Sequence, residues 1–176
     1  MTSVARTLPR RGPPRGPFRQ TGPVRHETLT LDAMTPRLVH DLARLRQDVF
    51  VVEQDCPYPD LDGRDAEPST LHVLLLDDAP GSDGSGHGQI VGCARVLDDG
   101  DDWRIGRVAL ARSARGQGLA DVVMRAALEH CPGRDVVLDA QAPLAGWYGS
   151  LGFEVCGPEF LEDGIPHLPM RRPSGG

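Results

Sequence analysis

Residues 112–121, RSARGQGLAD, place an arginine and two glycines where a helix begins. Glycine in a helical turn costs about 1 kcal/mol relative to alanine, so Gly116 and Gly118 need a compensating role. A helix N-terminus offers unpaired N–H groups and a partial positive charge, and glycines let a ligand approach that backbone closely. We therefore predict a diphosphate site here, with a purely structural loop as the alternative. The predicted contact residues are Arg115, Gly116, Gln117, Gly118, Leu119 and Ala120.

A dinucleotide site is the nearest rival for this glycine turn. The pattern Gly116-x-Gly118 opens a helix, and Asp139 follows at about the distance expected of a ribose ligand. Two features oppose this interpretation. The third small position is Asp121, and the five residues between Leu110 and Gly116 are too many for the tight turn of a dinucleotide fingerprint.

The elements around the turn form a strand, helix, strand unit. Apolar residues Leu119, Val122, Val123 and Ala126 recur at helical spacing, and Pro132 and Gly133 end the helix. Strands are expected at 103–111 and 136–141, and a right-handed crossover through the helix makes them parallel.

The rest of the chain predicts further strands and helices, so the fold class is a mixed α/β sheet. A helix starts at Thr35-Pro36 and carries Leu38, Leu42, Leu45 and Val49 on one face. An irregular loop rich in Pro and acids follows it at 51–68. The remaining expected elements are strands at 26–34, 72–78, 89–97, 152–157 and 167–172, turns at 81–88 and 161–166, and a short helix at 143–152.

Charge and composition divide the 176 residues into two parts. Residues 1–25 hold six arginines and no acid, and we expect this Arg/Pro-rich arm to be disordered. Residues 26–173 form one domain, and outside the arm 13 basic and 25 acidic residues give a charge of −12. An acidic body argues against nucleic acid as the main partner. No apolar run could span a bilayer, so we expect no membrane association and a cytoplasmic location.

Absent residues exclude several kinds of chemistry. All 19 residues counted as Lys or Arg are arginine, which excludes a Walker A lysine, a Schiff-base lysine and a lysine general base. The four cysteines are scattered without a C-x-x-C pair, so we expect neither a metal site nor a disulfide framework. They are Cys56, Cys93, Cys131 and Cys156.

The stretch RVALARSARGQGLADVVMRAAL resembles the acyl-CoA signature of the GNAT acyltransferase superfamily, with Arg115, Gly118 and Ala120 at matching positions. Downstream, AQAPLAGWYGSLGF resembles the last helix of that superfamily, and Tyr148 matches its tyrosine. The stretches RQDVFVVEQDCPYPDLDG, GRV, AQA and EDGIPH, together with His72, resemble the ElaA-type branch of that superfamily, and the matches extend from about residue 28 onward. The pattern of Arg46, Phe50 and the acidic loop is also similar to acyl-homoserine-lactone synthases.

The resemblance implies the GNAT fold, a twisted and mostly antiparallel sheet with one parallel, splayed strand pair flanked by helices. It also implies direct transfer of an acyl group, most simply acetyl from acetyl-CoA, to an amine in a ternary complex. Backbone amides of Val108, Ala109 and Leu110 would bind the pantetheine and polarise the thioester. Gln141, which stands where Asn is common, and Tyr148 complete the expected acyl-CoA contacts.

The predicted catalytic residues are Tyr148, Glu53 and His72. The resemblance implies that Tyr148 protonates the leaving thiolate; a packed core aromatic is the alternative. The strand around Arg104 to Ala109 contains no carboxylate, so the general base is sought in Glu53, His72 and His167, or in a water relay. Cys56 is expected to shape its loop rather than to act as a nucleophile.

Two alternatives to an acetyltransferase stay open on sequence alone. One is a module that binds acyl-CoA without turning it over, and the other is an acyltransferase similar to acyl-homoserine-lactone synthases. The loop acids could attract a cationic acceptor, but a solvated loop predicts the same residues. These acids are Glu53, Asp60, Asp62 and Asp65. The expected partners are acetyl-CoA and an amine acceptor, and a homodimer is left open.

Overall fold

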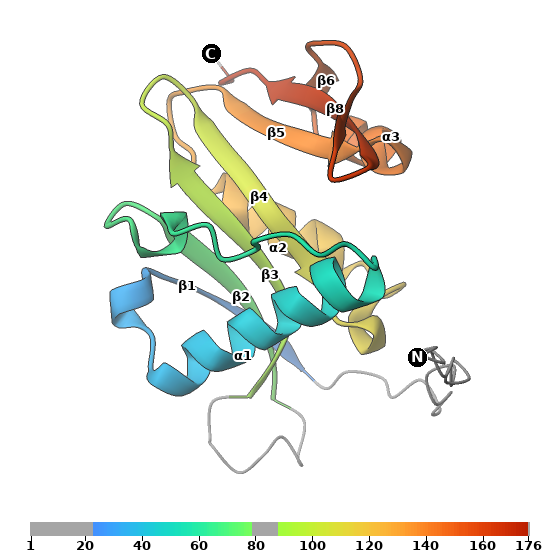
Figure 1. Ribbon diagram of the computed structural model, residues 1–176. Helices are drawn as coiled ribbons and strands as arrows, with labels where there is room; N and C mark the ends of the chain where they lie inside the picture. The colour runs from blue at the N-terminus through green and yellow to red at the C-terminus, as the bar shows by residue number, and fades with distance from the viewer. Residues whose placement is uncertain (1–22, 79–87, 176) are drawn as a thin grey trace, which may run out of the picture.

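The computed structural model describes residues 23–78 and 88–175, whose strands form one sheet with helices on both faces (Figure 1). The strands are β1 (Val24–Leu29), β2 (Leu71–Asp77), β3 (Gln89–Asp98), β4 (Trp103–Leu110), β5 (Val136–Gln141), β6 (Glu154–Val155), β7 (Phe160–Glu162) and β8 (Ile165–Arg172). The α-helices are α1 (Pro36–Arg46), α2 (Leu119–Leu128) and α3 (Ala145–Ser150). Shorter helical turns span Leu31–Ala33, Gln47–Glu53, Arg64–Ala66, Arg112–Ala114 and Ala142–Leu144.

The strand order is β1-β2-β3-β4-β5-β8-β6, with β7 paired to β8. Every pair is antiparallel except β4 and β5, which are parallel as the crossover through α2 requires. The β4–β5 ladder joins only Trp103 to Val136 and Arg104 to Val137, and the two strands then separate (Figure 1). The predicted mixed sheet with a splayed parallel pair is confirmed.

Strand β2 shows why the centre of the sheet is apolar on both sides. Successive side chains of a strand point to opposite faces. Val73 and Leu75 pack in the cluster that contains the buried face of α2, whereas Leu74 and Leu76 pack in the cluster beneath α1. Because helices cover both faces, the strand needs a continuous apolar run rather than an alternating one.

Helix α1 forms where its sequence signals predicted it. The Thr35 hydroxyl accepts a hydrogen bond from the Leu38 amide at 3.2 Å, and Pro36 occupies the first helical position. The four predicted apolar positions are buried against the sheet. The chain then widens into the π-helical turn Gln47–Glu53, which contains the predicted apolar residue Val49.

Three predicted details of the helices and strands were wrong. The strand predicted at 26–34 ends at Leu29, and Leu31–Ala33 form a helical turn. Helix α2 buries Val123, Met124, Ala126 and Ala127, while Val122 is 40% exposed. The helix is apolar over more than one face, so spacing alone could not choose which side the sheet covers. The predicted turn at 161–166 includes the last two residues of β7 and the first two of β8, and the actual turn is Asp163-Gly164 with φ of 50° and 81°.

The domain begins slightly earlier than the sequence indicated. β1 starts at Val24, within the segment predicted as an arm, because Arg25 pairs with Leu76 of β2 and forms an ion pair with Asp78 at 3.1 Å. The predicted disorder of the arm up to residue 22, and most of the turn at 81–88, lie outside the described residues. None of the helices in the described ranges combines the length and apolar character needed to cross a membrane.

Candidate active site

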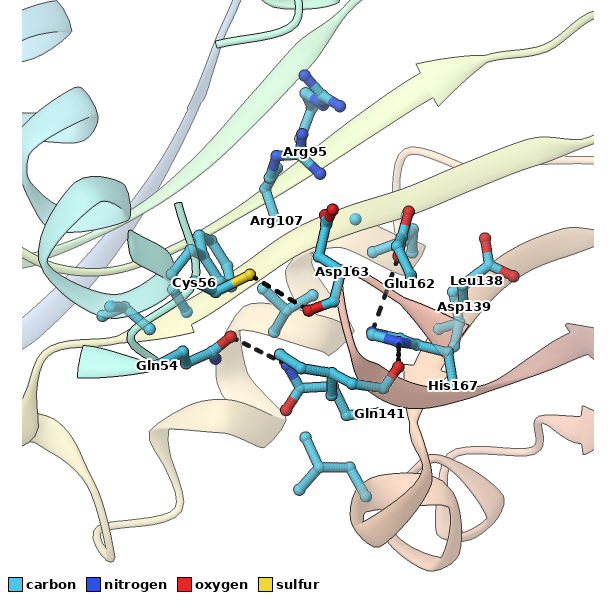
Figure 2. A pocket seen from close by; sticks show the side chains of 18 of the residues that line it. Gln54, Cys56, Arg95, Arg107, Leu138, Asp139, Gln141, Glu162, Asp163 and His167 are labelled. Carbon is cyan, nitrogen blue, oxygen red and sulfur yellow. Dashed lines mark hydrogen bonds and ion pairs between the residues drawn. The ribbon is translucent and has the colours of Figure 1, made fainter. Parts of the chain in front are cut away.

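A cleft opens where β4 and β5 separate, and we call it the split-strand cleft. Its cavity has a volume of about 670 Å³, within the range of small-ligand sites. The walls come from β4, β5, α3, the loop after α1 and the β7–β8 hairpin, so segments distant in sequence meet around one space (Figure 2). Predicted site residues in the lining are Glu53, Val108, Ala109, Leu110, Arg115, Gln141, Tyr148 and His167.

The β4 wall of the cleft is bulged. Arg95 pairs with Gly106 and Cys93 with Ala109, so one residue of β3 lies opposite the two residues Arg107 and Val108. Arg107 has a φ of 54°, which is uncommon for a residue with a side chain. Because a bulge interrupts the β3–β4 ladder and β5 has already diverged, this part of β4 has no paired residue on β5.

The glycine turn follows β4 and the short helical turn Arg112–Ala114, directly before α2. Gly116 and Gly118 have φ of 74° and 73°, and Gly118 is the N-cap of α2. A Cβ added at either position would meet no heavy atom within 4 Å. The glycines therefore provide left-handed backbone and leave open space before the first, intrahelically unpaired N–H groups of α2. The geometry fits an extended anionic group, although the residues beyond Arg115 lie outside the cavity lining itself.

Glu53 binds the arginines at this turn. Arg115 donates to the two Glu53 carboxylate oxygens at 2.6 and 3.0 Å, and Arg112 donates to the same carboxylate at 3.2 Å. The hydrogen bond from Arg115 is the main cause that lowers the pKa of Glu53. Glu53 therefore lies at the end of the cleft next to the glycine turn, with its carboxylate engaged by two arginines, and the base role expected of it stays a prediction.

His72 lies apart from the cleft lining. It is 1% exposed on β2, and its Nε2 is 3.1 Å from the Asp65 carbonyl oxygen. Burial lowers the pKa of His72, so the ring is neutral at physiological pH. The catalytic role expected of His72 stays a prediction.

Tyr148 borders the cleft with a buried ring. The ring is packed against Trp147 and Phe153, with centroids 4.6 and 5.9 Å away. Burial raises the pKa of Tyr148 to about 12, so the phenol keeps its proton at neutral pH. Within residues 23–78 and 88–175 its hydroxyl has no hydrogen-bond partner. The ring is thus packed as expected of a core aromatic, and the unpaired hydroxyl is compatible with the predicted role of Tyr148 as a proton donor.

A buried cluster of three arginines and three aspartates supports the β4 bulge, and the sequence analysis missed it. Its formal charges cancel, so Asp60, Asp62 and Asp65 are not free to attract a cationic acceptor. The side chain of Arg46 is 2% exposed and donates to Asp60 and Asp65 at 2.8 and 2.7 Å. We call this the arginine–aspartate cluster; its members are Arg46, Arg95, Arg107, Asp60, Asp62 and Asp65.

The cluster fixes the backbone around the cleft. Arg107 donates to the Asp60 carbonyl oxygen and to Asp62, both at 3.2 Å, which ties the strained residue of β4 to the loop. Two sequence signals could have revealed the cluster. Arg46 falls on the apolar stripe of α1, four residues after Leu42, and Arg95 lies inside the apolar run of β3. A charged residue at such a position needs a buried partner.

Acid should weaken the fold through this cluster and His72. Hydrogen bonds from Arg95 are the main cause that lowers the pKa of Asp62. Burial is the largest single influence on Asp65 and opposes its ionisation, but the hydrogen bonds and positive charges of Arg46 and Arg95 together outweigh it and lower the pKa of Asp65 too. Folded carboxyls of depressed pKa stabilise above about pH 4 and lose this stabilisation as pH falls further. The buried His72 adds an earlier loss below about pH 6.5.

This loss of stability can be measured as the urea concentration at the midpoint of unfolding, determined at several pH values between 8 and 3. We expect the urea midpoint to be constant down to about pH 6.5, to decline slightly between about pH 6.5 and 4, and to decline steeply below pH 4. The variant Asp65→Asn lacks one titrating group and should show a smaller decline below pH 4. If the urea midpoint of the variant falls below pH 4 as much as that of the wild type, titration of Asp65 does not contribute to the loss of stability in acid.

Comparison with known proteins identifies the family. The model of the acetyltransferase (GNAT) domain matches residues 84–173. A UPF0039 protein of Mycobacterium tuberculosis is 42% identical over 144 residues, which cover 80% of this chain and 87% of that protein. Protein ElaA of Escherichia coli is 38% identical over 141 residues, covering 76% and 86%. The chain belongs to the ElaA-type branch of the GNAT superfamily.

Solved structures agree with this GNAT assignment. An acyl-CoA N-acyltransferase from Pseudomonas aeruginosa has a TM-score of 0.77 at 36% identity, covering 85% of this chain and 99% of that one. The crystal structure of Escherichia coli ElaA has a TM-score of 0.76 at 34% identity, with the same coverage. The predicted family and fold are confirmed, and the GNAT fold implies an acyltransferase with acyl-CoA as co-substrate.

Proposed function

We propose that this GNAT protein transfers an acetyl group from acetyl-CoA to an amine by direct attack within a ternary complex. One observation carries the proposal: the separation of β4 from β5 leaves an open strand edge between Tyr148 and the glycine turn. The acyl donor and the acceptor can thus meet in one cleft. A cytoplasmic location, a homodimer and the absence of nucleic-acid partners stay predictions.

The donor would bind along β4 toward α2. The turn from Arg115 to Ala120 would hold the diphosphate, with Arg115 exchanging its Glu53 partner for phosphate oxygens. Charge-assisted hydrogen bonds contribute roughly 1.5–3 kcal/mol each, so three or four would supply much of the ~8 kcal/mol of micromolar binding. Backbone N–H groups between Val108 and Leu110 would bind the pantetheine and the thioester carbonyl. Gln141, which donates to Gln54 at 3.3 Å, would close the opposite wall.

The transfer needs an uncharged amine and a protonated leaving group. The amine nitrogen attacks the thioester carbonyl, a C–N bond forms, and the C–S bond breaks. The Tyr148 hydroxyl would then give its proton to the leaving thiolate and regain one from the new amide nitrogen. A tyrosine that keeps its proton at neutral pH suits this role as an acid.

The direct test is thiol release from acetyl-CoA in the presence of polyamines, amino acids, aminoglycosides and peptides. Calorimetric titration of acetyl-CoA accompanies it. Release with one acceptor class would support the proposal and give the acceptor chemistry. Binding without release from any amine would favour a module that binds acyl-CoA without catalysis, and the absence of binding would contradict the proposed site.

Replacing Tyr148 with Phe should slow transfer and spare donor binding. The variant keeps the packed ring and loses only the hydroxyl, so we expect a fall in kcat of roughly 10- to 100-fold. The Kd of acetyl-CoA should stay within about twofold, as calorimetry can check. The assignment of Tyr148 as the acid fails if kcat is unchanged.

Tyr58→Phe is the matched control, because Tyr58 is the only other tyrosine in the sequence and also lines the cleft. Its hydroxyl donates to Asp60 at 2.6 Å, so it is already engaged within the arginine–aspartate cluster. Its loss should therefore lower the free energy of unfolding by about 1 kcal/mol while affecting kcat less than Tyr148→Phe does.

A further inference from the structure

His167 lines the split-strand cleft from β8, the strand that pairs with β5. It is a residue of β8, paired with Gln141 of β5, and it is only 8% exposed (Figure 2). It lines the same cavity as Tyr148 and the bulged part of β4. The β5–β8 pairing therefore brings an imidazole to the cleft from the strand pair that faces β4.

One hydrogen bond selects the tautomer of His167. Its Nδ1 is 2.9 Å from the carbonyl oxygen of Ile165, and a carbonyl oxygen can only accept. Nδ1 must therefore carry the hydrogen, so in the neutral ring the lone pair is on Nε2. Stacking on Phe160, with centroids 5.9 Å apart and planes at 29°, also holds the ring orientation.

The surroundings of Nε2 suit a proton acceptor. Its distance to a carboxylate oxygen of Glu162 is 3.8 Å, too long for a hydrogen bond but close enough for attraction to an imidazolium. Glu162 and Asp163 come from the same hairpin, and the Cys56 thiol holds the hairpin through the Asp163 carbonyl at 3.7 Å. From the elements across the cleft, the titratable or charged groups of the lining include Arg104 and Arg107 from β4, Asp139 from β5 and Tyr148 from α3.

We propose that His167 is the general base that takes the proton from the acceptor amine. This inference rests on the proposed function. The ammonium form of the acceptor gives one proton to Nε2, which makes the amine nucleophilic and the ring an imidazolium. After C–N bond formation and C–S cleavage, the imidazolium releases that proton to solvent, and Tyr148 has supplied the proton of the free thiol. The net reaction forms an amide and a thiol and releases one proton.

Two variants separate proton transfer from ring placement. His167→Asn keeps a donor that can reach the Ile165 carbonyl but has no base at the Nε2 position, and His167→Gln offers only an amide there. His26→Gln is the control, since His26 is an exposed residue of β1 outside the cleft lining. The assay is thiol release from acetyl-CoA with the acceptor that gives the highest wild-type rate.

We expect both His167 variants to lose roughly 100-fold or more in kcat/KM for the acceptor at pH 7. The loss should shrink toward pH 9.5, because an amine of pKa near 10 then sheds its proton without help. The acetyl-CoA affinity should be unchanged, and His26→Gln should match the wild type. A loss of equal size at every pH would mean a positioning role and would overturn the proposal.

Failure of this inference can be distinguished from failure of the proposed function. If the wild type releases thiol and the His167 variants are equally active, only the base assignment falls. If the wild type releases no thiol with any amine of the panel, the proposed function falls and this inference with it. Nitrogen-15 spectra of the His167 ring give a readout independent of activity, with hydrogen on Nδ1 expected and a neutral ring protonated at Nε2 overturning the proposal.

Discussion

Replacing Gly118 with Val is expected to abolish measurable binding of acetyl-CoA, with a loss of at least about 100-fold in affinity. Gly118 has a φ of 73° at the N-cap of α2, and the space beyond its Cα is open. A β-branched side chain would fill the space proposed for the diphosphate and strain the left-handed backbone by about 1–3 kcal/mol. Calorimetric titration measures the affinity, and urea unfolding measures the stability.

Gly133→Val provides the matched control for strain. Gly133 follows the other end of α2, has a φ of 70°, and likewise has no heavy atom within 4 Å of an added Cβ. The same substitution there should cost similar stability and leave the acetyl-CoA affinity unchanged. Equal affinity in Gly118→Val and the wild type would show that the turn does not bind the diphosphate.

Asp65→Asn is expected to give the largest loss of stability. One Asp65 oxygen accepts hydrogen bonds from both Arg46 at 2.7 Å and Arg95 at 3.0 Å, and these arginine side chains are 2% and 5% exposed. Removing the negative charge leaves the buried cluster with a surplus positive charge. Breaking a buried ion pair costs about 3–5 kcal/mol, and we expect the lower end because the Asn carbonyl oxygen can still accept hydrogen bonds from both arginines. The urea midpoint should fall with an unchanged m-value.

Asp101→Asn removes the same charge at an exposed position in the turn between β3 and β4. It should change the free energy of unfolding by no more than about 0.5 kcal/mol. If Asp65→Asn also lowers the free energy of unfolding by less than about 0.5 kcal/mol, the arginine–aspartate cluster does not stabilise the protein. A large loss in both variants would point to net charge rather than to the buried pair.

The sequence predicted the elements whose signals are local. Strand β5 has the predicted bounds 136–141, and α1 begins at the predicted Thr35-Pro36. Gly116 and Gly118 were recognised because glycine at a helix start is costly, and both have positive φ. The apolar run in β2 predicted a buried strand. Local backbone preferences and hydrophobic periodicity suffice for such features because neighbouring residues supply all the information.

The assembly of the cleft depended on contacts between distant residues. Arg115 and Glu53 are 62 positions apart, and the sequence analysis placed one on the donor site and the other among the candidate bases. Arg95 and Asp62 are 33 positions apart and pair inside the protein, although the loop acids had been interpreted as substrate-attracting or solvated. Local patterning carries no information about which buried charge meets which partner, since that depends on strand pairing and loop path.

By itself the sequence determined the family, the order of the main elements, the glycine turn and Tyr148 as a candidate acid. Only the tertiary structure decided where the sheet splits, how the arginine–aspartate cluster holds the bulge at Arg107, and that Glu53 and His167 line the cleft, with Glu53 bound to Arg115, whereas His72 does not line it. The pairing of β5 with β8 brings His167 to the cleft, while β2 keeps His72 within the sheet. The physical reason is that a side chain's chemistry is fixed by its type, whereas its exposure, tautomer and partners are fixed by long-range packing.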